Sequence, residues 1–135
     1  MACVNRVEEL TILEELNRDR QRLDRAVSEL YNVTIDLRGG LNTAGEFVRG
    51  SADEMQAVLD GELIALEDRY LQEGQRLPAA DIRAARVNQI VREKHPDLWS
   101  RHLVLESRET ALKQTISGRK AAIGAAQSIL RGERS

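Results

Sequence analysis

Apolar residues in the last third of the chain recur with a seven-residue rhythm. The spacing alternates between three and four, which is typical of one face of an α-helix in a coiled coil. A face this long and narrow needs an equally long partner, so we expect a helix over about 96–131 in a chain that associates. Seven of the ten stripe positions are apolar; the stripe consists of Leu98, His102, Leu105, Glu109, Leu112, Ile116, Arg119, Ile123, Ala126 and Leu130.

A second stripe with the same spacing runs through the first quarter of the chain. It predicts a helix over about 5–38, which ends at Gly39-Gly40 because glycine readily adopts the left-handed conformation of a helix end. Two polar positions interrupt the stripe, as residues that fix the register do. Its positions are Leu13, Leu16, Arg20, Leu23, Val27, Leu30, Thr34 and Leu37.

Residues 39–50 are rich in glycine and predict a flexible linker. Two shorter helices are expected within about 51–94. Ser51 and Glu54 match a capping box that opens the first of them, and a break around Gly74 and Pro78 separates the two. His95-Pro96 then marks the start of the last helix, because the residue before proline disfavours the helical conformation.

The composition agrees with long helices rather than a large compact core. Only four residues are aromatic and 31% are charged, so association between copies is a natural source of stability. The predicted fold is therefore one all-α domain over 1–135, with long amphipathic helices in a helical bundle or coiled-coil-like homo-oligomer. Six residues are expected at the contact between subunits: Leu105, Leu112, Ile116, Ile123, Gly124 and Leu130.

The single cysteine, Cys3, excludes an internal disulfide framework and fits an inert thiol in a reducing cytoplasm. No apolar run reaches the ~18 residues of a membrane span, and no basic segment followed by an apolar one marks a signal peptide. The sequence thus predicts a cytoplasmic protein without a membrane partner.

Charge is unevenly distributed along the chain. Residues 51–75 hold seven acidic residues and one basic one, whereas residues 111–135 hold five basic residues and one acidic one. Both segments are explained by solvated helix faces; alternatively, the basic end meets an anion and the acidic element faces a protein. On a helical wheel, Lys113, Lys120 and Arg131 fall within about 20° of one another, which forms a basic stripe suited to a nucleic-acid backbone.

The side chains that could support catalysis are sparse. The two histidines, His95 and His102, are too far apart to share a metal ion, and His102 with Glu106 lacks a third ligand. No serine or threonine has a histidine and a carboxylate patterned around it. We therefore expect no enzymatic activity, no cofactor and no metal site.

Two segments resemble the UvsY-type recombination mediators of T4-type phages. They are ALEDRYLQEGQ at 65–75, followed by a break and a short helix, and ALKQTISGRKAAIGAAQSI at 111–129 in the closing helix. The basic pair of that family maps onto Glu67 and Arg69, and only Arg69 keeps the charge. The DNA contacts are therefore expected at basic residues around the break and on the closing helix: Arg69, Arg76, Arg83, Arg86, Lys113 and Lys120.

The resemblance implies a phage-encoded protein of the bacterial cytoplasm that forms homo-oligomeric rings and binds single-stranded DNA. It further implies a recombination mediator that loads a RecA-like recombinase onto DNA coated by single-strand-binding protein. The alternative from the residues alone is a coiled-coil protein-interaction module, such as an assembly chaperone, an adaptor or an inhibitor of a host protein.

Overall fold

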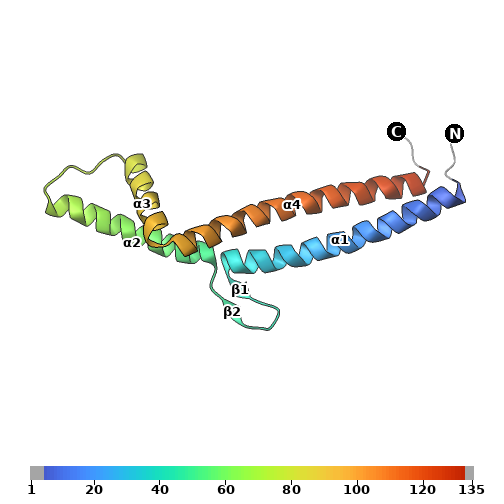
Figure 1. Cartoon of the computed structure of the whole chain (residues 1–135), viewed down its shortest axis with the longest axis horizontal. Coiled ribbons are helices and arrows are strands. Elements are labelled where there is room, and N and C mark those ends of the chain that lie inside the picture. The colour runs from blue at the N-terminus through green and yellow to red at the C-terminus, as the bar shows by residue number, and fades with distance from the viewer. Residues whose placement is uncertain (1–4, 133–135) are drawn as a thin grey trace. The chain divides into compact units, whose positions relative to one another are not determined.

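The computed structural model describes residues 5–132, so Cys3 lies outside the described residues. Four helices account for most of the described chain, and the expected all-α class is confirmed (Figure 1). The elements are α1 (Arg6–Arg38), β1 (Gly40–Leu41), β2 (Phe47–Val48), α2 (Ser51–Gln72), α3 (Ala80–Lys94) and α4 (Pro96–Leu130). None of the helices within this described part combines the length and apolar content needed to cross a bilayer.

The helices end where the sequence contains residues that stop them. Gly39 follows α1 with a φ of +84°, and its N–H donates to the Ile35 carbonyl at 2.7 Å. Gly74 follows α2 with a φ of +66°. These positive angles are the left-handed conformations that favour glycine at a helix end. Pro96 is the first residue of α4, a position whose N–H has no partner within the helix, so the missing N–H of proline costs nothing.

The chain divides into two compact units. One unit contains the residues up to Asn32 and those from Arg108 onward, and the other contains Val33–Ser107. The long helices α1 and α4 each contribute to both units.

The first unit is a hairpin of two antiparallel helices, formed by α1 up to Asn32 and α4 from Arg108. Asp19 accepts a hydrogen bond from Arg119 at 3.1 Å, and Glu29 lies 3.7 Å from Arg108. The later residue of α1, Glu29, pairs with the earlier residue of α4, Arg108, so the two helices run in opposite directions.

The inner face of α4 in this unit is the stripe that the sequence predicts. Its seven side chains in this unit are all buried or half-buried: Glu109, Leu112, Ile116, Arg119, Ile123, Ala126 and Leu130. The long partner that the stripe needs is therefore α1 of the same chain. The expected contact of Leu112, Ile116, Ile123 and Leu130 with a second subunit stays a prediction, and these half-buried side chains already pack within one chain.

The register predicted for α1 is wrong at alternate positions. Leu13 and Val27 are 47% and 49% exposed, and Arg20 is exposed too. The residues one position earlier, Ile12, Asp19 and Ala26, occupy the seam together with Leu16, Leu23 and Leu30. Both registers share the leucines, so apolarity alone does not separate them. The ion pair of Asp19 with Arg119 places Asp19 inward, and Arg20 consequently faces out.

This register gives a direct prediction for two leucines three residues apart. Leu16 is 4% exposed and Leu13 is 47% exposed. We expect Leu16→Ala to lower the free energy of unfolding by about 2 to 4 kcal/mol, and Leu13→Ala by less than about 1 kcal/mol. Urea denaturation followed by circular dichroism measures both, and equal losses would contradict the seam.

The second unit has its core between α2 and α3. Met55, Leu66, Val87 and Val91 are its buried side chains, and Val91 is fully buried. Leu98 and Trp99, at the start of α4, pack against them. Three ion pairs connect α2 to the helices beside it: Glu54 with Arg101, Glu62 with Lys94, and Glu67 with Arg83.

Segment 39–50 is an ordered hairpin rather than the flexible linker that its glycine content predicts. β1 and β2 pair antiparallel, with Leu41 opposite Phe47. The Asn42 carboxamide oxygen accepts hydrogen bonds from the N–H groups of Ala44 and Glu46, both at 3.0 Å. An Asn that bonds its own turn in this way fixes a tight connection, and glycine-rich composition does not reveal it.

The predicted capping box at the start of α2 is also wrong. The N-cap residue is Gly50, which has no side chain to bond the helix, and Ser51 is the first helical residue. The Ser51 hydroxyl bonds His102 at 2.9 Å, and the Glu54 carboxylate pairs with Arg101. Both side chains are therefore engaged by α4 instead of by the backbone of α2.

Candidate nucleic-acid interface

A groove of about 470 Å³ lies where the end of α2 meets α3. Arg69 and Tyr70 enter it from α2, and Arg86 enters it from α3. Two of the four arginines expected at the break thus share one site with one of the four aromatic residues of the chain. A guanidinium group can bind a phosphate, and an aromatic ring beside it can stack on a base.

Arg86 and Tyr70 hold each other in place. The Arg86 guanidinium carbon lies 6.0 Å from the centroid of the Tyr70 ring, and Nη1 donates a hydrogen bond to the Tyr70 hydroxyl. A cation at this distance is attracted to the face of the ring. Since these contacts restrict both side chains, part of the ordering cost of binding is already met.

The groove carries charges of both signs. Glu73 and Glu93 line it with the arginines, as do the amides of Gln75 and Gln89. Over residues 69–94 as a whole, six basic residues face three acidic ones. The balance is positive, and an anionic strand would meet the arginines most favourably away from the two glutamates.

Arg76 lies in the loop between α2 and α3 and is exposed, as is Arg69. Neither guanidinium has an ion-pair partner within the part of the chain that the structure describes. Both charges are therefore available to an outside anion.

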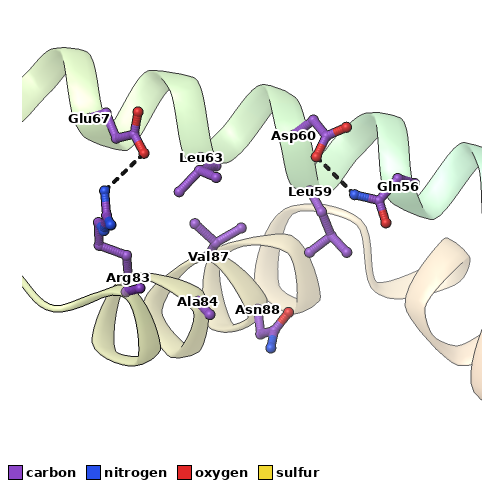
Figure 2. Close-up of a pocket in the computed structure, with 10 residues that line it drawn as sticks. Gln56, Leu59, Asp60, Leu63, Glu67, Arg83, Ala84, Val87 and Asn88 are labelled. Carbon is purple, nitrogen blue, oxygen red and sulfur yellow. Dashed lines mark hydrogen bonds and ion pairs between the residues drawn. The ribbon is translucent and has the colours of Figure 1, made fainter.

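Arg83 is separated from the other three arginines. It lines a second groove between α2 and α3, where it donates to Glu67 at 3.1 Å (Figure 2). Its Nε atom is buried and lacks a hydrogen-bond acceptor in the structure. An arginine already paired with a carboxylate is a poor phosphate ligand, so we do not include Arg83 in the candidate interface.

The two lysines expected to bind DNA belong to the other compact unit. Lys113 lies 3.5 Å from the Glu109 carboxylate, one helical turn away. Lys120 is exposed and has no ion pair within residues 5–132. The structure therefore groups the arginines on one unit and the lysines on the other.

The remaining predicted contact residues occupy two different settings. Leu105 is half-buried and lines a cavity of the second unit with Val48 and Arg49. Gly124 faces open space, because a β-carbon built on it meets no atom within 4 Å.

A hydrogen-bond chain that no pattern in the sequence indicates runs through Ser51, His102 and Glu106. The Ser51 hydroxyl meets His102 Nδ1 at 2.9 Å, and His102 Nε2 contacts the Glu106 carboxylate. Ser51 and His102 are 51 positions apart, so no local pattern joins them. Ser51 is only 1% exposed, which closes its oxygen to a substrate, and the three side chains tie the start of α2 to α4.

The described residues also contain no candidate metal site. No group of three or more His, Cys, Asp or Glu side chains is arranged around a common point among the described residues.

Comparison with known proteins gave no match: no family model fits the chain, and neither the curated proteins nor the solved structures contain a significant relative.

Proposed function

We propose that this protein binds single-stranded DNA in the groove formed by Arg69, Tyr70 and Arg86, with Arg76 beside it. The observation that carries this proposal is one groove lined by Arg69 from α2 and Arg86 from α3, in which Arg86 lies over the ring of Tyr70. The arginines would contact successive phosphates, and Tyr70 would stack on one base. A strand that is free to bend can follow such a short site, whereas a rigid duplex cannot present one base to the ring.

This chemistry gives a binding mode with few sequence preferences. Phosphates are the same at every position, and every base has a face that can stack on an aromatic ring. Affinity should therefore depend mainly on ionic strength, because each neutralised phosphate releases counterions.

The proposed role in the cell is that of a non-enzymatic recombination mediator, encoded by a phage and acting in the bacterial cytoplasm. The resemblance of residues 65–75 and 111–129 to UvsY-type mediators supports it. Under this proposal, repeated copies of the groove in a homo-oligomer organise DNA for a RecA-like recombinase in the presence of single-strand-binding protein. Exposed apolar side chains on α1, such as Leu10 and Leu13, support association with a further surface.

A second candidate function is a coiled-coil protein-interaction module. The exposed acidic side of α2 favours it, because an acidic helix repels DNA and suits a basic protein surface. An adaptor, an assembly chaperone or an inhibitor of a host protein would all fit that description.

Binding of fluorescein-labelled oligothymidylate, measured by anisotropy across a series of salt concentrations, separates the two functions. The mediator proposal predicts binding at low salt that falls steeply with log salt, with a slope of about −0.7 per phosphate contact. A labelled duplex of the same length should bind more weakly. Absence of any anisotropy change at tens of micromolar protein and low salt would favour the interaction module.

A further inference from the structure

The second groove, between α2 and α3, combines an apolar floor with the Asp60 carboxylate, and its one guanidinium, that of Arg83, is already paired with Glu67. Its volume is about 260 Å³, and Leu59, Leu63 and Val87 form its apolar floor (Figure 2). Asp60 lies at its rim, where its one hydrogen-bond partner among the described residues is the neutral amide of Gln56, at 2.8 Å. A lysine can lay its aliphatic stem on such a floor while its ammonium reaches the carboxylate.

Asp60 belongs to an acidic face of α2 whose charge no basic side chain among residues 5–132 neutralises. Residues 51–68 contain six acidic residues and no basic one. Three of the six are paired with basic side chains of α3 and α4. Asp53, Asp60 and Asp68 are exposed and form no ion pair with a basic side chain among the described residues. They fall within about 80° of one another on the helix surface. Ile64, which is 60% exposed, lies among them.

α4 carries a face with the opposite charge and matching spacing. Lys113 and Lys120 are seven residues apart, as are Asp53 and Asp60, so both pairs span two turns, or about 10.5 Å. Gly124 follows Lys120 by four residues, as Ile64 follows Asp60. No atom lies within 4 Å of the β-carbon position of Gly124, so an outside side chain has room there.

We infer that the acidic face of α2 (Asp53, Asp60, Ile64 and Asp68) binds the basic face of α4 (Lys113, Lys120 and Gly124) of a second copy of this chain. With the helices parallel, the two aspartates face the two lysines, and Ile64 faces Gly124. Lys120 then lays its stem along the groove beside Asp60. Each copy presents both faces, so the contact is heterologous and propagates into a ring or a filament.

Charge reversal tests this contact without DNA, so its outcome is independent of the proposed DNA binding. Sedimentation velocity over a range of protein concentrations measures association. We expect Asp60→Lys and Lys120→Glu each to weaken association by about tenfold or more, because each places like charges opposite one another. The double variant should restore the association of the wild type. Asp24→Lys, on the exposed side of α1, is the matched control and should leave association unchanged.

Gly124→Leu provides a variant whose fold is not at risk. The side chain enters open space within its own chain, and leucine favours helix over glycine, so its thermal midpoint should equal or exceed that of the wild type. Its association should nevertheless weaken, because the leucine occupies the space of Ile64 of the second copy.

Three results would overturn the inference. The first is a wild-type protein that remains monomeric at a concentration of about 10⁻⁴ M, at which even weak specific contacts form. The second is a double charge reversal that associates no better than the single variants, with circular dichroism showing both to be folded. The third is a folded Gly124→Leu protein that associates like the wild type.

Discussion

Replacing Gly50 by alanine is expected to lower the free energy of unfolding by about 3 kcal/mol or more. A β-carbon at Gly50 would lie 2.4 Å from the Arg38 carbonyl carbon and 2.5 Å from both the Gly39 nitrogen and the Leu37 oxygen. All three are backbone atoms, which cannot move aside as a flexible side chain does. The substitution should therefore separate the end of α1 from the start of α2 and disrupt the hairpin between them.

Gly61→Ala is the matched control for this prediction. Gly61 lies within α2, and a β-carbon there meets no atom within 4 Å. The alanine should stabilise the helix by up to about 1 kcal/mol, because glycine has the lower helix propensity. Urea denaturation of both variants measures the difference, and a Gly50→Ala protein as stable as the wild type would show that the close approach is not real.

Replacing Arg69, Arg76 and Arg86 together by alanine is expected to weaken binding to single-stranded DNA by at least about tenfold at low salt. Three phosphate contacts at about 0.7 each would also lower the slope of log affinity against log salt by about 2 for each bound subunit. The three side chains are exposed, so the fold should persist. Anisotropy titrations at several salt concentrations give both quantities.

A triple variant of Arg6, Arg18 and Arg25 to alanine is the control. These three arginines lie on α1, are exposed and carry the same total charge. If net charge alone governed binding, both triple variants would lose affinity equally. The proposed interface requires that the variant at the groove lose far more.

The stripe of α4 could be predicted from the sequence because it depends on local periodicity. Each of its positions repeats the same three- and four-residue spacing, and Glu109 and Arg119 fit the stripe despite their charge. The α1 register could not be predicted in the same way, since Leu13 and Ile12 are equally apolar. The ion pair between Asp19 and Arg119 decides it across 100 positions.

The sequence predicts the shared site of the arginines around the break only in part, because the ion-pair partner of Arg83 lies on another helix. Their charge and clustering are visible in the sequence, and Arg69 and Arg86 do meet in one groove. Their partners are not visible. Arg83 pairs with Glu67, sixteen positions away on another helix, and leaves the set. Similarly, Gly50 gives no local sign that it packs against the backbone of residues 37–39.

The groove at Arg69, Tyr70 and Arg86 is proposed to receive single-stranded DNA. The most direct test is a titration of the ¹⁵N-labelled protein with oligothymidylate, observed through backbone amides and arginine Nε–Hε signals. We predict shifts at Arg69, Tyr70, Arg76 and Arg86, with the Arg83 side-chain signal unmoved. Signals that stay unchanged at these positions, or that shift only around Lys113 and Lys120, would contradict the account.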